Sequence, residues 1–310
     1  MGVTLPPQAR AHIDAFAAEV AGEDPVTCVG GRTQWEVGGA VPAGTREVSA
    51  PRGVIVHEPA DMTVVCGAGT PVAELEAVLT AHGQMVPLDP DQPATATVGG
   101  VLAVGRSGPR RLRYGHIRDL LLQAAVVSAD GSVVRAGGPT VKNVSGYDLH
   151  RVQVGALGTL GFLAEVRLRC LPIPTAARWF TTGADPFTLC RSLYRPSSVL
   201  WDGSTTWVLL EGHPDDVDAQ AVGHDLVEAD GPPPLGDRAR TSHRPSQLTV
   251  AVEAFGAGRF VAEIGVGVVH HRDLPATPVP VPAPDAVDLH MKLKQAFDPS
   301  GRLNPGRQPW

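Results

Sequence analysis

The amino-acid sequence predicts an α+β protein. Short β-branched runs bounded by Gly and Pro lie between amphipathic stretches that carry apolar residues at helical spacing. The turn Asp130-Gly131 joins two such runs, as in a hairpin. Farther along, residues 175–284 alternate strand-like and helix-like pieces. With 310 residues, 43% of them hydrophobic, the chain can bury a sizeable core.

The predicted elements of the first part follow one another closely. They are a helix at 12–20, strands at 26–29, 54–56 and 62–66, a helix at 71–82, a hairpin of strands 120–127 and 133–135, and a strand at 162–170. Pro71 in the first turn and Thr70 before it favour a helix start. The strong alternation of 162–170 indicates a half-exposed strand, which Pro172 and Pro174 end. A domain is therefore expected over residues 1–174.

The rest of the chain is expected to form a second domain and a tail. Residues 175–284 are interpreted as a small α+β cap or substrate domain that ends in a proline-rich linker. Residues 285–310 are interpreted as a C-terminal helix and tail that return to the first domain. The elements predicted in these parts are strands at 207–210 and 248–252, a helix at 288–297 and turns at 298–307.

Net charge and hydropathy argue against nucleic-acid-binding, membrane-spanning and secreted proteins. A net charge of −6 argues against nucleic acid as the main partner, because a phosphate backbone needs a basic surface. No apolar run is long enough to span a membrane, and residues 1–7 lack the basic region and apolar core of a signal peptide. A cytoplasmic protein without its own membrane span is expected.

The four cysteines, Cys28, Cys66, Cys170 and Cys190, are scattered and form no CxxC pair. Neither a zinc ribbon nor an iron–sulfur cluster finds its ligands in such a pattern. We expect small buried apolar side chains at these positions. Any iron–sulfur cluster that the protein works with must then lie on another chain.

The run Gly30-Gly31-Arg32-Thr33 directly follows a predicted strand. Glycines there let consecutive backbone N–H groups converge on an anion such as a pyrophosphate, although an ordinary tight turn is the alternative. The usual dinucleotide fingerprint, GxGxxG at the start of a helix, is missing, and so is GxxxxGK[ST]. Residues 155–161 carry glycine at every third position, which by itself fits either a nucleotide loop or close packing.

Six motifs occur along the chain in a fixed order. They are GGRT, PATATVGG, RYGHIRD with a following DG turn, KNVSGYDL, GALGTLGF and FDPSGRLNPG. In this order they resemble the FAD-binding family of vanillyl-alcohol oxidase and p-cresol methylhydroxylase (PCMH) type. Within that family the chain is most similar to the E subunit of bacterial glycolate oxidase. The resemblance covers residues 25–172 and 294–307.

The resemblance implies a fold of two α+β subdomains that clasp an extended FAD, whose flavin ring faces the cap domain. It implies that the Gly30 loop holds the pyrophosphate, and that the tail at Asn304 returns toward the ring. The residues implied in cofactor binding are Gly30, Gly31, Arg32, Thr33, Gln34, Thr95, Thr97, Val98, Gly99, Gly100, Ser107, Gly108, Tyr114, Arg118, Asn143, Gly146, Tyr147, Asp148, Gly158, Thr159, Gly161, Phe162 and Asn304.

The chain departs from the family pattern in two ways. Members with covalent flavin often carry a His in the pyrophosphate loop, where this chain has Arg32 and Thr33. We therefore expect a non-covalent FAD. The second departure is the short cap, which lacks a clear set of catalytic base and metal ligands, so no metal site is expected.

Oxidation by a flavin requires the protein to bind the substrate carboxylate and to accept the hydroxyl proton. Arg106, Arg110, Arg111, Arg113 and Arg118 form a candidate carboxylate clamp; solvated charges and phosphate contacts are the alternative. Tyr114 and Arg118 lie in a family motif and are expected to position the cofactor. For the base, His270 is the candidate, against a surface or core histidine.

The resemblance implies an FAD-dependent subunit that oxidises glycolate or a related 2-hydroxy acid. Its implied partners are a larger homologous flavoprotein subunit and an iron–sulfur subunit, through which it would also associate with the membrane. Two alternatives stay open. One is an FAD-binding electron relay or structural subunit without its own turnover. The other is an independent sugar or alcohol oxidase that reduces oxygen directly.

Overall fold

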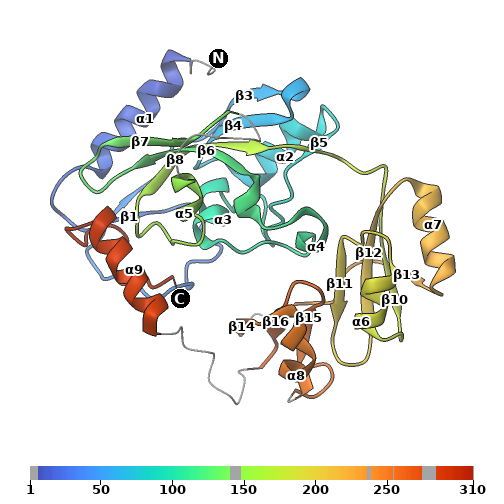
Figure 1. The fold of residues 1–310 in the computed structure, drawn as a ribbon. Coiled ribbons are helices and arrows are strands. Elements are labelled where there is room, and N and C mark those ends of the chain that lie inside the picture. Colours follow the sequence, from blue (N-terminus) through green and yellow to red (C-terminus); the bar gives the residue numbers. More distant parts are fainter. Residues whose placement is uncertain (1–5, 140–147, 236–238, 254, 274–283, 310) are drawn as a thin grey trace. The chain divides into compact units, whose positions relative to one another are not determined.

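The structure, a computed structural model, divides into two compact units (Figure 1). It describes residues 6–139, 148–235, 239–253, 255–273 and 284–309. The first unit comprises residues 1–108, 116–173 and 282–310, and the second comprises 109–115 and 174–281. The short internal segment 109–115, which we expected in the first domain, thus belongs to the second unit.

The first unit is built on a five-stranded antiparallel sheet with the order β3-β4-β8-β6-β7. A parallel pair, β1-β2, and a short antiparallel pair, β5-β9, accompany it. The strands are β1 (Val26–Cys28), β2 (Arg46–Val48), β3 (Val54–Glu58), β4 (Thr63–Gly67), β5 (Gln84–Met85), β6 (Leu121–Val127), β7 (Val133–Gly137), β8 (Phe162–Arg169) and β9 (Leu171–Pro172). The predicted hairpin is confirmed, with Val127 opposite Val133.

Helices of the first unit supply the apolar faces that the sheet needs. They are α1 (Pro7–Val20), η1 (Pro59–Asp61), α2 (Val72–Thr80), α3 (Val98–Val104), η2 (Ile117–Leu120), α5 (Leu149–Val152) and α9 (Pro284–Phe297). In the main core Leu75 and Leu79 of α2, one helical turn apart, and Leu102 of α3 pack in one cluster with Val166 and Leu168 of β8. Each such buried side chain contributes roughly 1.5–3 kcal/mol.

Strand β8 is buried, so the expected half-exposed strand is wrong. It pairs with β4 on one side and β6 on the other, which makes it the central strand of the sheet. The alternation is real, but its polar side chains are held in ion pairs. Glu165 lies 2.8 Å from Arg135, and Arg167 lies 3.0 Å from Glu58. Partners on β7 and β3, each one strand beyond a neighbour of β8, thus allow charged residues in a buried strand.

Two predicted helix starts differ from the observed ones. Helix α1 begins at Pro7, five residues before the predicted start, because proline suits a first turn. Thr70 does not cap α2; its hydroxyl donates to the Gly67 carbonyl at 2.6 Å. Within the described residues, no helix combines the length and apolar character that a bilayer crossing requires.

The second unit is built on a seven-stranded sheet with the order β13-β10-β12-β11-β15-β16-β14. Its elements are α4 (Arg111–Tyr114), β10 (Ala176–Thr182), α6 (Pro186–Ser192), β11 (Ser198–Trp201), β12 (Thr206–Gly212), α7 (Pro214–Gly223), β13 (Val227–Ala229), β14 (Ala239–Ser242), η3 (Pro245–Gln247), α8 (Leu248–Glu253), β15 (Phe260–Glu263) and β16 (Val268–His271). Phe180, Val208, Leu210 and Phe260 lie in its core. Its composition of strands and helices agrees with the α+β fold class.

The predicted strand 248–252 is wrong, because these residues form helix α8. Leu248 and Val252, four residues apart, are both buried, whereas Val250 between them is 71% exposed. A period of four fits a helix on the core, and the preceding turn η3 leads directly into it. The β-branched composition had favoured a strand.

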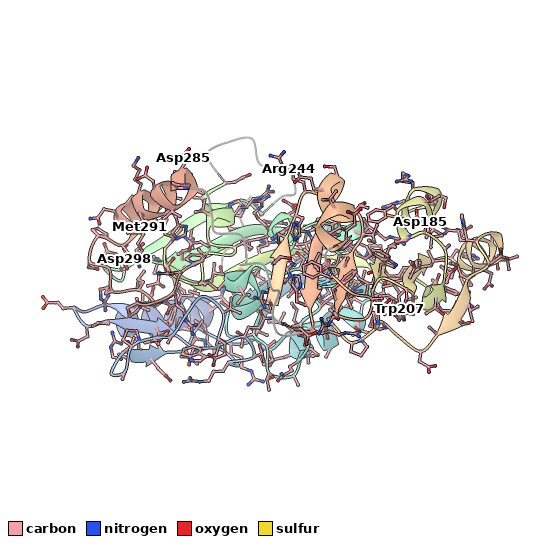
Figure 2. The ribbon with its side chains drawn as sticks, turned by 90° about the horizontal axis from the view of Figure 1, so that it is seen from below. Asp185, Trp207, Arg244, Asp285, Met291 and Asp298 are labelled. Carbon is pink, nitrogen blue, oxygen red and sulfur yellow. The ribbon has the colours of Figure 1, made fainter. Side chains whose placement is uncertain are left out.

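Helix α9 begins at Pro284, four residues before the predicted start, and none of its side chains is buried. Figure 2 labels Asp285 near its start, Met291 along it and Asp298 just beyond its end. Lys294 anchors the helix by donating to the Thr159 carbonyl (2.8 Å), the Leu303 carbonyl (3.0 Å) and the Asp298 carboxylate (2.5 Å). Of the predicted linker 275–284, residues 275–283 lie outside the described residues.

Candidate functional site

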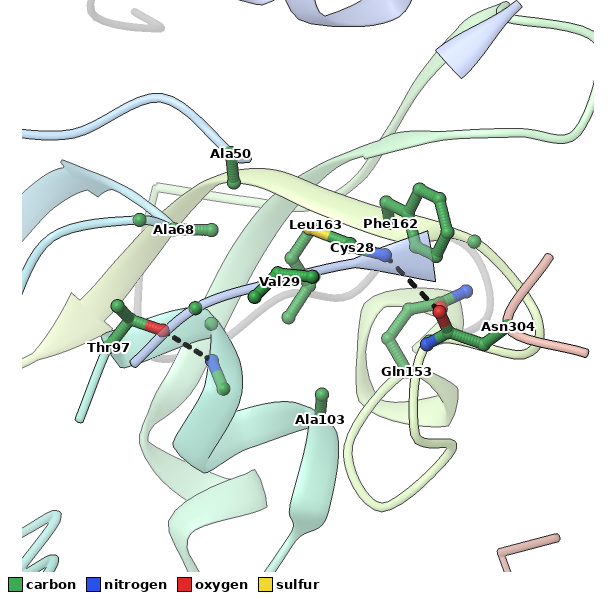
Figure 3. Close-up of a pocket in the computed structure, with 16 residues that line it drawn as sticks. Cys28, Val29, Ala50, Ala68, Thr97, Ala103, Gln153, Phe162, Leu163 and Asn304 are labelled. Atoms are coloured by element: carbon green, nitrogen blue, oxygen red, sulfur yellow. Dashed lines mark hydrogen bonds between the residues drawn. The ribbon is translucent and has the colours of Figure 1, made fainter. Parts of the chain in front are cut away.

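A cavity in the first unit lies where β1 ends, α3 begins and the C-terminal tail returns (Figure 3). It encloses about 490 Å³ of empty space, part of it open to solvent. Its lining is almost entirely glycine, alanine and small apolar residues. The lining residues are Cys28, Val29, Gly30, Ala50, Ala68, Gly69, Thr97, Gly99, Gly100, Ala103, Gln153, Gly158, Gly161, Phe162, Leu163 and Asn304.

The loop that follows β1 presents a run of unused backbone donors. The N–H groups of Gly30, Gly31, Arg32, Thr33 and Gln34 donate no hydrogen bond within the described part of the chain. The N–H groups on either side are used, since Val29 donates to Val48 and Trp35 donates to Arg32. Consecutive free N–H groups form a concave partial positive charge that binds anions.

Three glycines are required here because atoms of neighbouring segments approach them closely. A Cβ on Gly31 would lie 1.8 Å from the Thr95 carbonyl oxygen. A Cβ on Gly30 would lie 2.3 Å from Thr97 Oγ1, and one on Gly99 would lie 2.8 Å from the Ala68 Cβ. The β1 loop therefore packs directly against the segment that leads into α3, and the start of α3 packs against Ala68.

The backbone N–H groups at the start of α3 donate hydrogen bonds to other groups of the protein. Val98 donates to the Thr70 carbonyl (2.9 Å) and Gly99 to the Ala68 carbonyl (2.7 Å). Thr97 caps the helix, accepting from the Gly100 N–H at 3.2 Å (Figure 3). Of the free donors at residues 30–34, Gly30 lines the cavity and the others follow it along the loop, while Thr97, Gly99 and Gly100 at the α3 start form part of the wall.

Asn304 of the tail joins the cavity from the far end of the sequence. It has a left-handed backbone (φ 43°) and is 8% exposed. Its Oδ1 accepts from the Cys28 N–H at 3.2 Å (Figure 3), and its Nδ2 donates to the Leu157 carbonyl. A Cβ on Gly158 would lie 2.6 Å from that Nδ2. One side chain therefore fixes both glycine loops.

Gln153 and Cys28 line the cavity but were missed as cofactor residues from the sequence. Gln153 is 4% exposed and its Oε1 has no hydrogen-bond partner among the described residues, so it is available to a ligand. Burial raises the pKa of the Cys28 thiol to about 12, which keeps it protonated and unreactive. No sequence signal marks Gln153, which follows the short helix α5 and lies outside every motif.

Several predicted residues serve the scaffold instead of lining the cavity. The Ser107 hydroxyl accepts from the Ile117 N–H at 3.1 Å. The Thr159 hydroxyl donates to the Ala156 carbonyl at 2.7 Å. A Cβ on Gly108 would lie 2.2 Å from the Asp89 Cβ. These positions hold the loops that the cavity depends on.

Three further predicted residues lie elsewhere, and three lie outside the described residues. Tyr114 belongs to the second unit, where burial, and next the Glu211 carboxylate, raise its pKa to about 12. The Arg118 side chain is 55% exposed and lies 4.0 Å from Asp119. Asp148 pairs with Arg151 at 3.5 Å. The residues outside the described part are Asn143, Gly146 and Tyr147.

The arginine cluster does not act as one group. In the second unit Arg110 lies 3.7 Å from the Glu211 carboxylate, and Arg113 donates to the Glu211 carbonyl. In the first unit burial lowers the pKa of Arg106, opposed by the charge of Asp91. Arg106 remains cationic at neutral pH, because an arginine titrates far above it.

His270 is paired in the second unit. Its Nε2 lies 2.7 Å from Glu263 Oε1, on the neighbouring strand of the sheet. The His270 side chain is 13% exposed and the Glu263 side chain 5%. The other oxygen of Glu263 has no partner among the described residues. A carboxylate that holds one ring nitrogen leaves the other nitrogen to exchange a proton.

The described residues contain no group of three His, Cys, Asp or Glu side chains placed to hold a metal ion. All four cysteines are free; Cys66 and Cys170 are buried, and Cys28 and Cys190 are half-buried. Burial raises the pKa of Cys66 and of Cys170 to about 12. These two behave as the expected small apolar residues.

Comparison with known proteins gives matches in both sequence and structure. Residues 3–137 match the family described as FAD binding domain. Glycolate oxidase subunit GlcE of Escherichia coli is 34% identical over 169 residues, which are 54% of this chain and 48% of that protein. D-lactate dehydrogenase of Archaeoglobus fulgidus is 39% identical over 152 residues, 48% of this chain and 33% of that protein. The chain spans half or less of these curated relatives.

A solved structure described as alkyldihydroxyacetonephosphate synthase shares the fold. Its TM-score is 0.64 at 17% identity, over 96% of this chain and 74% of that chain. The resemblance expected from the ordered motifs is thereby confirmed, as is the α+β fold class. The free N–H groups of residues 30–34 and the unpaired Gln153 Oε1 suit a dinucleotide with a charged diphosphate. Residues 3–137 of the chain therefore match an FAD binding domain, and FAD is its cofactor.

Proposed function

We propose that this chain is an FAD-dependent oxidoreductase subunit that oxidises glycolate or a related 2-hydroxy acid. The observation that carries the proposal is the glycine-lined cavity with its run of free N–H groups, in a chain related to glycolate oxidase subunit GlcE and to a D-lactate dehydrogenase. Both relatives are named for acids with a hydroxyl group beside the carboxylate.

On the cofactor side, the proposal assigns the diphosphate to the N–H groups of residues 30–34. Thr97 and Asn304 would hold the two flanking walls in place. The Gln153 Oε1 would accept a hydrogen bond from the cofactor, because it is buried without another partner among the described residues. FAD supplies a two-electron acceptor for the hydride that leaves the substrate α-carbon.

On the substrate side, the proposal assigns the hydroxyl proton to His270. Glu263 accepts from the His270 Nε2 at 2.7 Å, so Nδ1 carries the lone pair that takes the proton. The substrate loses a hydride and a proton and becomes a 2-oxo acid. The buried carboxylate of Glu263 stabilises the imidazolium that forms.

Arg106 is the member of the arginine cluster that we propose to bind an anionic group in the first unit. Arg110 and Arg113 already serve Glu211, whereas Arg106 has no ion pair within the described residues. Burial lowers the pKa of Arg106, which reflects a poorly hydrated guanidinium. Such a cation gains most from a bidentate carboxylate.

Partners complete the proposal. We propose a larger homologous flavoprotein subunit and an iron–sulfur subunit as partners. The subunit would be cytoplasmic, and at the membrane only through these partners.

Anaerobic stopped-flow absorbance tests the proposal. The FAD-loaded chain is mixed with glycolate, D-lactate and a non-hydroxylated acid as control, and the oxidised-flavin band is followed. Bleaching by a hydroxy acid alone supports the proposal. No bleaching by any hydroxy acid overturns it in favour of an electron-relay or structural subunit. Rapid reoxidation of the reduced chain by air would instead indicate an independent oxidase.

A further inference from the structure

The C-terminal tail runs along both flanks of the loop that carries the free N–H groups. Before the loop, Leu303 bridges Val26 in β1, and Asn304 accepts from Cys28. After the loop, the Gln308 N–H donates to the Gly38 carbonyl at 2.6 Å. Residues 30–34 between these flanks make no backbone hydrogen bond through their N–H groups to any described residue.

Arg307 supplies the strongest contact after the loop. Its Nη1 donates to the Val37 carbonyl at 2.8 Å and also to the Gly39 carbonyl. Its guanidinium lies 4.6 Å from the centre of the Trp35 ring, and the Arg32 guanidinium lies 4.5 Å from the same ring. Trp35 thus contacts one cation from the loop and one from the tail, an attraction that the ring quadrupole favours.

The two segments approach so closely that neither tolerates a side chain at the contact. A Cβ on Gly306 would lie 2.3 Å from the Ala40 carbonyl oxygen. A Cβ on Gly39 would lie 2.8 Å from the Gly306 carbonyl oxygen. The tail is therefore fitted against residues 37–40 over its backbone, with Arg307 as its side-chain anchor.

From these contacts we infer that residues 303–308 brace the anion-binding loop, and that Arg307 is a positioning residue for the FAD diphosphate. A loop whose N–H groups have no protein partner is expensive to order when a ligand binds, and a brace that orders it beforehand lowers that cost. Arg307 also adds positive potential beside the free N–H groups, whereas the charge of Arg32 is paired with Glu47 at 2.6 Å. The inference rests on FAD binding and is independent of which substrate is oxidised.

Replacement of Arg307 by Met tests the brace, with Arg259→Met as the matched control. Arg259 is a 70% exposed arginine of the second unit that pairs with Asp273. Dissociation constants for FAD and ADP are measured by titrating the apoprotein, without any substrate. We expect Arg307→Met to weaken the binding of FAD and of ADP by about tenfold each, since both ligands carry the diphosphate and two charge-assisted hydrogen bonds are lost. The control variant should change neither dissociation constant.

Hydrogen exchange of the apoprotein separates a local brace from general destabilisation. Arg307→Met should speed amide exchange in peptides that cover residues 28–40 and leave the β4 and β8 peptides unchanged. Arg307→Lys keeps the charge but not the planar fork, so it should fall between wild type and Met in both readouts. Gly39→Ala, which pushes on the tail from the loop side, should reproduce the Met result.

Three results would overturn the inference. The first is a folded Arg307→Met or Gly39→Ala protein that binds FAD within twofold of wild type. The second is a loss for FAD without a loss for ADP, which would place the effect away from the diphosphate. The third is faster exchange spread over the whole first unit, which would make Arg307 a general stability residue. If the other variants do not fold, ligand binding and amide exchange are measured on Arg307→Lys instead.

Discussion

Asn304 and Cys28 are joined by a 3.2 Å hydrogen bond across a sequence separation of 276 residues. The bond connects the last residue of β1 to the C-terminal tail. The same amide group of Asn304 also donates to the Leu157 carbonyl in the turn before Phe162. Two walls of the FAD cavity therefore depend on a single side chain.

Replacing Asn304 should weaken FAD binding, and two variants separate the reasons. Asn304→Gly keeps the left-handed backbone and removes only the side chain, whose two hydrogen bonds are worth about 1–3 kcal/mol in total. Asn304→Ala adds backbone strain of roughly 1–2 kcal/mol. In urea unfolding we expect the wild type to be more stable than Asn304→Gly, and Asn304→Gly to be more stable than Asn304→Ala. Both variants should bind FAD more weakly than the wild type. Equal affinity in all three proteins would contradict the role assigned to the amide group.

Gly31→Ala should abolish FAD binding while leaving the fold intact. The added Cβ would lie 1.8 Å from the Thr95 carbonyl oxygen, so one of the two loops must move. The ratio of flavin absorbance to protein absorbance in the purified protein measures the loss. Gly183→Ala is the control, because a methyl group at that position would meet no other atom within 4 Å. A fully yellow Gly31→Ala protein would show that this close contact is dispensable.

FAD should be released when the protein is precipitated with acid. Among the residues that line the cavity, the Cys28 thiol is the one nucleophilic side chain, and burial raises its pKa to about 12. A protonated thiol does not form a bond to the flavin. We expect a colourless pellet and a yellow supernatant. A pellet that stays yellow after washing would establish a covalent link.

His270→Asn should slow flavin reduction by about 100-fold or more, the usual cost of a lost general base. The FAD dissociation constant should stay unchanged, since His270 is not one of the residues that line the cavity. Reduction is followed by anaerobic stopped-flow at saturating substrate. His213→Asn is the control, because His213 is 64% exposed and asparagine keeps its helix-capping role. An undiminished rate in His270→Asn would remove His270 as the base.

Stability should fall as the pH decreases below about 6.5, the usual pKa of an unfolded histidine. Burial, and next the charges of His243 and His270, lower the pKa of His271 in the folded protein. The unfolded chain therefore binds more protons than the folded one in this range, and protons favour unfolding. Above it the penalty disappears. Urea unfolding between about pH 5 and about pH 8 should show that the free energy of unfolding of His271→Gln falls less steeply with decreasing pH than that of the wild type. The same slope in both proteins would show that groups other than His271 cause the decline.

The order of the glycine-rich motifs was enough to predict the fold class, the family and the cofactor. This order can be seen in the sequence without knowledge of the structure. Gly30, Gly99 and Gly158 do line the cavity. Neighbouring motif residues such as Ser107 and Thr159 support the loops instead, and a motif does not distinguish the two roles. The sequence did not predict Gln153 as a cofactor-binding residue, because the evidence for it is a buried side-chain oxygen without a hydrogen-bond partner, which only the packed structure reveals.

The errors in secondary structure have a common physical origin, which is tertiary packing. Alternation in β8 predicted exposure, but Arg135 and Glu58 neutralise its buried Glu165 and Arg167. In α8 the β-branched residues predicted a strand, but burial of Leu248 and Val252 selects a helix. The segment 109–115 lies in the first part of the sequence and packs with the second unit, where Arg113 contacts Glu211. Local patterns carry no information about such distant partners.

The contact between Arg307 and Val37 spans 270 residues. During synthesis, β1 and the glycine loop leave the ribosome long before the residues that brace them. The loop must remain without its brace, and without its full affinity for FAD, until residue 308 has emerged and folded back. Tight loading of the cofactor is thus expected only after Arg307 has been synthesised, so a nascent chain shortened before Arg307 should bind FAD more weakly than the longer chain.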